Sequence, residues 1–219
     1  MKTDWFGTVQ QILVAARGAD LRILGITSPH LGSGVSTLAR QVAENCSRSG
    51  TRTLLVDMTA PVSEPASFLP SWAPGQPGAQ GAIKTLTAGY EQLTCLPTTE
   101  TRFFFNNTQL LRRTFDTELD QYGTVIVDLP ALLAKQPFLL SGLASAAICD
   151  AVCMVCVTGR ETLDELTTVS DMLKTARIRL LGIVLNDGVS PKPAKRLEKR
   201  TVASDQFVRT DYSRPRTQE

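Results

Sequence analysis

Near the N-terminus a strand, a glycine-rich loop, a helix and a second strand follow one another, and this order constrains the fold more than any other feature. The run LRILGIT (21–27) has the short apolar character of a buried parallel strand. After the loop, STLARQVAENCSRSG (36–50) shows helical spacing of apolar residues up to Gly50, a residue type that commonly ends helices. TRTLLVDM (51–58) predicts the second strand. Such a βαβ unit is right-handed, so we expect a parallel sheet with the helix N-terminus at its ligand-binding edge.

The same alternation continues through most of the chain. Further strands are expected at residues 92–98, 124–130, 150–158 and 179–187. Further helices are expected at residues 5–16, 82–90, 106–123 and 161–177. The pattern predicts the α/β class, with a doubly wound, mostly parallel sheet in a Rossmann-like three-layer sandwich.

Two segments fall outside the alternation. Residues 60–81 are rich in proline, glycine and serine and predict a long irregular loop, which is either a lid or a surface for docking a partner. From residue 189 onward the chain is basic and poor in apolar residues, which predicts a flexible tail. We therefore expect one domain at residues 1–188 and a tail at residues 189–219. The tail lacks an apolar face, so only weak contact with anionic lipid is expected of it.

Charge and hydropathy exclude several function classes. The chain has 23 Lys and Arg against 21 Asp and Glu, so it lacks the positive field of a nonspecific nucleic-acid binder, and no nucleic-acid partner is expected. No stretch approaches the roughly 20 apolar residues that span a bilayer, and the N-terminus is too polar for a signal peptide. Any membrane association must therefore come through a partner or through the C-terminal tail.

The five cysteines favour a packing role. Cys153 and Cys156 form a CxxC pattern, but residues three apart on a strand point to opposite faces of a sheet. A zinc site or a redox pair is the alternative to packing in the core. Unpaired thiols of this kind suit a reducing compartment.

The loop SPHLGSGVST (28–37) carries the chemistry. A phosphate-binding loop needs glycines that turn backbone amides toward phosphate oxygens, a lysine for the β and γ phosphates, and a hydroxyl for magnesium. Gly32 and Gly34 supply the turn and Ser36 the hydroxyl, whereas Val35 stands at the lysine position. His30 is either a phosphate contact or an exposed loop residue. The candidate nucleotide-binding positions in the loop are Gly32, Ser33, Gly34, Val35, Ser36 and Thr37.

Two aspartates end strands that are expected to reach the same edge of the sheet. Asp57 closes LLVDM and Asp128 closes VIVDLP. Each is either a cap of the turn that follows or, together with the loop, a group that handles magnesium and the nucleophile in phosphoryl transfer.

The succession of these segments closely resembles the cytoplasmic ATPase domain of bacterial tyrosine kinases of polysaccharide export, within the deviant-Walker P-loop family. The resemblance spans roughly Trp5 to Asp187 and implies a loop of the form S-x-x-P-G-x-G-K-S-T, with Val35 in place of lysine. It makes Asp57 and Asp128 catalytic positions in a degenerate, non-catalytic form, and Ser36 and Asp128 ligands of Mg if nucleotide binds. It also places Asn186 where relatives contact the base, although a turn at the strand end is an equal reading.

Other family features are eroded. The strand motif usually has a second acidic residue, where this chain has Thr59, and the ring-packing E-x-x-R-x-x-R of the first helix corresponds to Asp4, Gly7 and Gln10. The tail of relatives holds a tyrosine cluster, of which only Tyr212 remains as a phosphoacceptor.

These losses together predict a pseudokinase whose status as an enzyme is uncertain. Loss of the lysine removes roughly 4 kcal/mol or more of transition-state stabilisation. ATP or ADP with Mg remains a doubtful cofactor. The resemblance implies a regulatory or scaffold subunit of bacterial exopolysaccharide or capsule biosynthesis and export, which docks on an inner-membrane polysaccharide co-polymerase. It therefore implies a cytoplasmic protein that is peripheral at the inner membrane through this partner, either as a homo-oligomer or paired with an active homologue.

Two other functions stay open from the sequence. One is an active ATPase or tyrosine autokinase that uses Arg40, Arg160 or a partner's arginine as a substitute cation, with Tyr212 as its acceptor. The other is an adaptor of the cell-positioning ATPase type.

Overall fold

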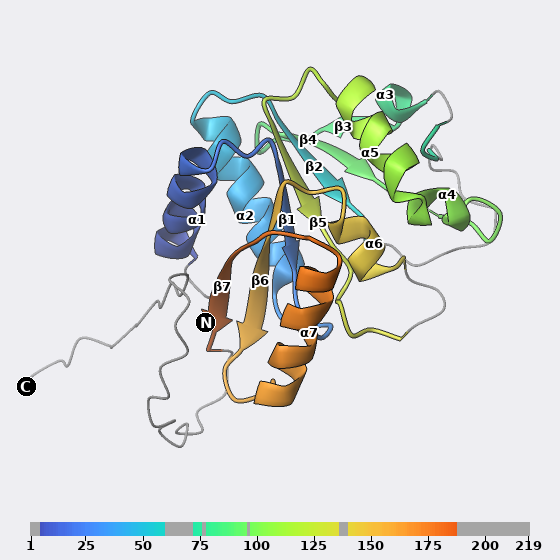
Figure 1. The fold of residues 1–219 in the computed structure, drawn as a ribbon. Helices are drawn as coiled ribbons and strands as arrows, with labels where there is room; N and C mark the ends of the chain where they lie inside the picture. Colours follow the sequence, from blue (N-terminus) through green and yellow to red (C-terminus); the bar gives the residue numbers. More distant parts are fainter. Residues whose placement is uncertain (1–4, 60–71, 76–77, 96, 136–139, 188–219) are drawn as a thin grey trace, which may run out of the picture.

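One sheet organises the part of the chain that the computed structural model describes, residues 5–59, 72–75, 78–95, 97–135 and 140–187 (Figure 1). Its strands are β1 (Ile23–Thr27), β2 (Thr53–Asp57), β3 (Ile83–Thr85), β4 (Glu91–Thr94), β5 (Thr124–Asp128), β6 (Ala151–Val157) and β7 (Leu180–Asn186). Their order is β3-β4-β2-β5-β1-β6-β7, and every neighbouring pair is parallel except β3 with β4. The expected α/β class with a mostly parallel sheet is confirmed.

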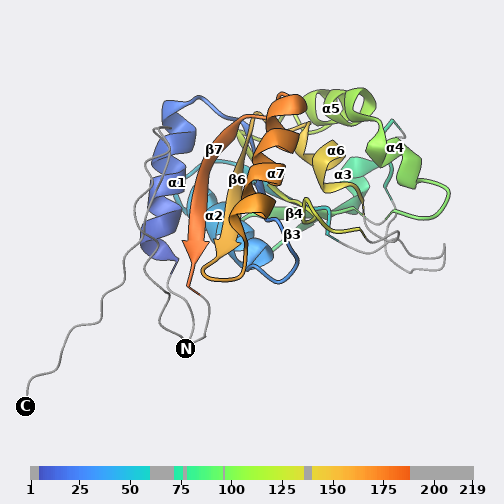
Figure 2. The ribbon, with the colours of Figure 1, turned by 60° about the horizontal axis from the view of Figure 1, so that its bottom comes forward.

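Helices cover both faces of the sheet. They are α1 (Phe6–Gly18), α2 (Val35–Arg48), α3 (Ala79–Ala82), α4 (Arg102–Asn106), α5 (Thr108–Thr117), α6 (Gly142–Ala146) and α7 (Leu163–Thr175). Figures 1 and 2 show α1 and α2 on one face and α5, α6 and α7 on the other. None of the helices in the described ranges has the length and apolar character needed to cross a membrane.

The two faces bury separate apolar clusters because strand residues alternate. Ile23 joins the cluster under α5 and α7, whereas its neighbour Leu24 joins the cluster under α1 and α2. Cys156 and Cys153 divide in the same way, which confirms that the CxxC side chains point to opposite faces. Burial raises the pKa of each of these two thiols to about 12. These cysteines are therefore protonated core residues.

The helix expected at residues 82–90 is wrong. Ile83–Thr85 forms β3, which pairs antiparallel with β4, and the turn between them closes with a 3.0 Å bond from the Leu86 N–H to the Tyr90 carbonyl. Gly89 adopts a φ of 91° in this turn, a conformation that favours glycine. β-Branched residues at alternate positions before the glycine turn, Ile83, Thr85 and Thr87, thus favoured a strand over the helix that the short apolar pattern had indicated.

Two other expectations concern residues outside the described ranges in part or in whole. Within the expected loop 60–81, residues 79–81 belong to α3, and residues 60–71 and 76–77 lie outside the description. The tail 189–219, with Tyr212, also lies outside it.

Candidate phosphate-binding site

The glycine loop lies between β1 and α2 and has left-handed backbone at both expected glycines. The φ angles of Gly32 and Gly34 are 77° and 92°, a region that residues with a Cβ rarely adopt. Gly34 caps α2, and its carbonyl accepts the Leu38 N–H at 3.0 Å. The loop therefore delivers the chain into a helix N-terminus, where backbone N–H groups without helical partners favour an anion.

Val35 begins α2 as a buried side chain. It is 9% exposed and belongs to the apolar cluster formed by α1, α2 and the sheet. The position that would carry the lysine of a phosphate-binding loop thus contributes a core contact in this chain.

The two strand-end aspartates are brought together. Asp57 on β2 lies directly opposite Asp128 on β5 in the parallel register, and both strands end there. The carboxylate of Asp57 accepts the backbone N–H of Thr59 at 2.9 Å and its hydroxyl at 2.7 Å. Asp57 therefore caps the turn that follows, and Thr59, at the place of the expected second acid, is turned back onto it.

The carboxyl group of Asp128 is buried, and one of its two oxygens lacks a hydrogen bond among the described residues. The residue is 2% exposed, and the oxygen without a partner is Oδ1. Burial, together with the nearby charge of Asp57, raises the pKa of this carboxyl to about 6, against the opposing effects of a hydrogen bond from Ser36 and the charge of Arg40. A buried carboxylate with an open oxygen beside a serine hydroxyl is a donor set that suits Mg²⁺.

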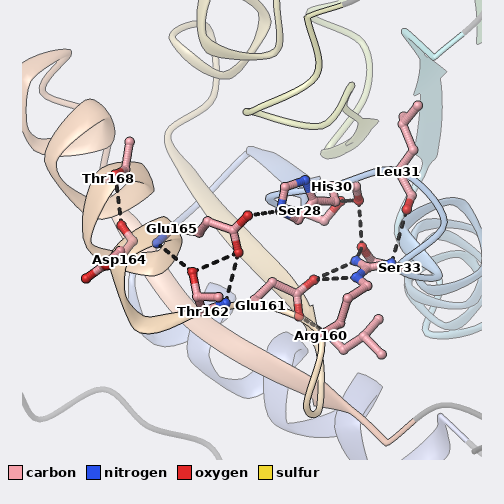
Figure 3. A network of polar contacts seen from close by, with 11 residues as sticks. Ser28, His30, Leu31, Ser33, Arg160, Glu161, Thr162, Asp164, Glu165 and Thr168 are labelled. Atoms are coloured by element: carbon pink, nitrogen blue, oxygen red, sulfur yellow. Dashed lines mark hydrogen bonds and ion pairs between the residues drawn. The ribbon is translucent and has the colours of Figure 1, made fainter.

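The carbonyl side of the loop is held by two side chains from the far half of the sequence (Figure 3 shows the first). Arg160 donates from Nη1 to the Leu31 carbonyl at 3.2 Å and from Nη2 to the Ser33 hydroxyl. Asn186, at the end of β7, donates from Nδ2 to the Ser33 carbonyl at 2.9 Å. In a trans peptide the carbonyl and the next N–H point in opposite directions, so both side chains lie away from the amides of Gly32 and Gly34.

Glu161 fixes Arg160 in this position. Its carboxylate accepts Arg160 Nε at 2.9 Å, and it also accepts the backbone N–H of Val157 at 2.8 Å. The Glu161 side chain is only 2% exposed. Arg160 is therefore the counter-charge of a buried acid, and it contacts the loop on the side opposite the amides of Gly32 and Gly34.

His30 ties the loop to α7. Its Nε2 lies 2.9 Å from Oε1 of Glu165, and Figure 3 shows this pair beside the start of the helix. Glu165 also closes the capping box of α7 with Thr162, and hydrogen bonds from Thr162 and His30 lower its pKa. The imidazole is thus a half-buried, paired group and not a free loop side chain.

The structure brings most of the predicted site to one edge of the sheet. The glycine loop, the Asp57–Asp128 pair and Asn186 all lie there, with the Asn186 amide engaged by the loop itself. Glu161 and Glu165 were not predicted as parts of the site. The only local signal for them was the T-x-x-E capping pattern at residues 162–165, which marks Glu165.

Comparison with known proteins identifies the fold. No family model matches the chain, and no curated protein matches it. Among solved structures, the BceF tyrosine kinase domain is 21% identical, with a TM-score of 0.62 over 81% of this chain and 74% of that one. The kinase domain of the Escherichia coli tyrosine kinase ETK is 17% identical, with a TM-score of 0.68 over 87% of this chain and 80% of that one.

A third similar structure was solved with nucleotide. The septum site-determining protein MinD of Pyrococcus horikoshii, complexed with Mg-ADP, is 20% identical, with a TM-score of 0.59 over 78% of this chain and 72% of that one. The chain has the fold of a P-loop ATPase. Within this fold the glycine loop connects β1 to α2, and Val35 stands at the position of the expected lysine.

Proposed function

We propose that this chain is a pseudokinase-type regulatory and docking subunit of bacterial exopolysaccharide or capsule biosynthesis and export. It lies at the cytoplasmic face of the inner membrane because it docks on a polysaccharide co-polymerase, either as a homo-oligomer or paired with an active homologue. The fold likeness to the BceF and ETK tyrosine kinase domains supports this assignment. In this view the fold is kept for binding, and phosphoryl transfer is lost.

The burial of Val35 carries the proposal. Phosphoryl transfer depends on positive charge at the β and γ phosphates, and the side chain at this position is an isopropyl group packed in the core. The absence of a positive charge at this position removes roughly 4 kcal/mol or more of transition-state stabilisation, which is a rate loss of about a thousandfold.

Arg160 does not replace the lysine in the observed arrangement. It lies on the carbonyl side of the loop, and moving it to the phosphate side would leave the buried carboxylate of Glu161 without its counter-charge. Breaking such a pair is costly, so the guanidinium is held where it is.

Binding of nucleotide without turnover fits the remaining groups. Backbone amides at the start of α2 suit a diphosphate, and Ser36 with Asp128 suits the Mg²⁺ that accompanies it. Bound Mg²⁺ would neutralise phosphate charge beside these two residues. Bound Mg²⁺ would lower the pKa of the Asp128 carboxyl, because a cation favours the ionised form.

The test is calorimetric titration of the native protein, Val35→Lys and Val35→Met with Mg-ADP and Mg-ATP. Methionine matches the length of lysine without its charge, so it controls for size. We expect Val35→Lys to bind at least about tenfold more tightly than both other proteins, because only it restores the cation. Equal micromolar binding by all three would show that another group supplies the charge, and the enzyme function would replace this one.

Docking is tested separately by co-purification. The purified chain should retain a polysaccharide co-polymerase solubilised from the inner membrane of the source cells, and Val35→Met should retain it equally well. Failure to retain any co-polymerase would refute the docking role.

The competing function is an active ATPase or tyrosine autokinase with Tyr212 as acceptor. The contact between Arg160 and the loop is the observation in its favour. It requires ATP hydrolysis that Arg160→Gln and Asp128→Asn each abolish, and phosphate incorporation that Tyr212→Phe removes.

A further inference from the structure

The two edges of the sheet, as far as the described residues form it, differ in how they are protected. β3 forms one edge with three residues and carries the exposed Lys84 at its centre. β7 forms the other edge with seven residues, LLGIVLN, which include neither a charged residue nor a proline. Short strands, lysines and prolines keep an edge from pairing with another chain, so β7 is the edge that is open to pairing.

The backbone of β7 directs hydrogen-bonding groups away from the sheet. The carbonyl of Asn186 accepts the Thr158 N–H at 2.9 Å, so the backbone of Asn186 faces β6. Backbone groups alternate in direction along a strand, which places the N–H and C=O of Ile183 and Leu185 on the outer side. Residues 182–186 pair with β6 in regular register, and no strand of the described residues pairs with their outer side. These groups can therefore bond to an added strand.

The helices beside β7 pack on the two faces of the sheet. α1 belongs to the apolar cluster that includes Val184, whereas α7 belongs to the cluster against which Ile183 packs. Figures 1 and 2 show these two helices on either side of β7. The side chain of Leu185 is 38% exposed, and Leu181 and Ile183 are partly exposed. An added strand would cover this apolar surface as well as pair with the backbone.

The two ends of β7 carry opposite charges. Arg179 precedes the strand and Asp187 follows it, and both residues are exposed. When two copies of the strand lie antiparallel, the start of each lies beside the end of the other, so Arg179 of one copy comes within reach of Asp187 of the second. A parallel arrangement would instead bring like charges together. The charges therefore favour antiparallel pairing of β7 with itself.

The apolar residues match in the same arrangement. Ile183 is the middle residue of β7 and lies midway between Arg179 and Asp187. A two-fold axis near Ile183 brings Leu181 of one copy beside Leu185 of the other. An interface with two-fold symmetry requires such a self-complementary surface.

We propose that β7 pairs antiparallel with β7 of a second copy of this chain, so that two sheets join across a two-fold axis near Ile183. The backbone of Ile183 and Leu185 forms the hydrogen bonds, and contacts between Arg179 and Asp187 fix the register. The occupant is a second copy because the complementary charges lie at the two ends of one strand. This inference goes beyond the proposed function and holds with or without docking on a co-polymerase.

The first experiment measures the mass of the full chain by sedimentation velocity at increasing concentration. We expect a dimer of twice 23.8 kDa that dissociates on dilution. Leu185→Pro removes an outer N–H without removing a bond to β6, so it should raise the dissociation constant at least about tenfold. Lys84→Glu, at the opposite edge of the sheet, is the control and should dimerise as the native protein does.

The second experiment tests the register and does not depend on whether Leu185→Pro folds. Arg179→Glu and Asp187→Arg should each raise the dissociation constant about tenfold, because each places like charges together at both ends of the interface. The double variant Arg179→Glu/Asp187→Arg restores opposite charges and should dimerise within about threefold of the native protein. The loss in the single variants should shrink at high salt, which screens exposed charges.

Amide hydrogen exchange identifies what covers the edge. In the dimer the amides of Ile183 and Leu185 should be protected, and this protection should fall on dilution. A chain that stays monomeric at millimolar concentration would refute the proposal, and protected amides in that monomer would show that the chain covers its own edge. A dimer that Leu185→Pro and both single charge reversals leave unchanged would also refute it, because the copies would then meet elsewhere. Failure of the double charge reversal to restore the dimer would overturn the antiparallel register.

Discussion

Replacing Asp128 with asparagine should stabilise the protein at neutral pH. Asp128 is 2% exposed, its Oδ1 has no partner among the described residues, and burial raises its pKa from 3.8 to about 6. Asparagine keeps an oxygen that can accept the Ser36 hydroxyl and removes the buried charge. The shift of about two pH units corresponds to about 3 kcal/mol, at about 1.4 kcal/mol per unit.

The direction of the pH dependence of stability follows from the protons that Asp128 binds in the folded and unfolded chains. Between pH 4 and about 6 the native carboxyl holds a proton that the unfolded chain has released, so the free energy of unfolding falls as the pH rises through this interval. The whole of the loss is present at pH 7.5, and almost none of it well below pH 3.8. Asp128→Asn lacks this step, so its advantage over the native protein should grow from near zero to about 3 kcal/mol across the interval.

Urea denaturation of both proteins at matched pH values measures the difference, and all other carboxylates cancel because the two chains share them. Ser36→Ala is a useful companion, since it removes a hydrogen bond that opposes the shift and should move the transition to higher pH. An Asp128→Asn variant that is no more stable at pH 7.5 than the native protein would refute the reasoning. So would an advantage that is the same at pH 4.5 and pH 7.5.

Three further predictions concern packing and capping. Gly25→Ala should lower the free energy of unfolding by about 1 to 3 kcal/mol, because a Cβ there would lie 2.6 Å from Leu129 Cδ1. The control is Gly18→Ala, where a Cβ would have no atom within 4 Å, and it should change the free energy of unfolding by less than about 0.5 kcal/mol. Equal effects of the two substitutions in thermal unfolding would contradict the tight packing at Gly25. Thr162→Ala should lower the free energy of unfolding by about 1 kcal/mol through loss of the α7 capping box. Thr167→Ala, in the same helix but away from the cap, should lower it by less. A Thr162→Ala variant as stable as the native protein in thermal unfolding would argue against the cap. The five thiols, all buried, should react with Ellman's reagent only after denaturation, and rapid labelling of the native chain would show that the core opens.

Local patterns in the sequence were sufficient for the parallel strands of the sheet and for the placement of the loop. Buried parallel strands such as β1 and β5 are continuous apolar runs, and the left-handed glycines Gly32 and Gly34 lie where the motif requires them. The placement of Asp57 and Asp128 at one edge of the sheet followed from the pattern, because parallel strands end at one edge, whereas the direct pairing of β2 with β5 is known only from the structure. The helix expected at residues 82–90 failed because a short apolar pattern cannot separate a helix turn from a hairpin.

Contacts between distant residues could not be predicted in the same way. Arg160 reaches Leu31 across 129 positions of sequence, and Asn186 reaches Ser33 across 153. Arginine 160 was one of several candidate cations in the sequence, but only the geometry shows that it faces loop carbonyls. Likewise the burial of Val35 depends on how α1 and α2 close over the sheet, which no local motif encodes.

The bracing of the glycine loop by Arg160 and Asn186 has a thermodynamic consequence for the binding of a phosphate. Because folding itself orders this loop, an incoming phosphate would spend little binding free energy on ordering it, and its departure would release little motion. A loop that keeps one shape with and without bound phosphate has no second conformation for a nucleotide to select. In the complex that we propose, such a loop would present one fixed surface, and any switching would have to come from the partner.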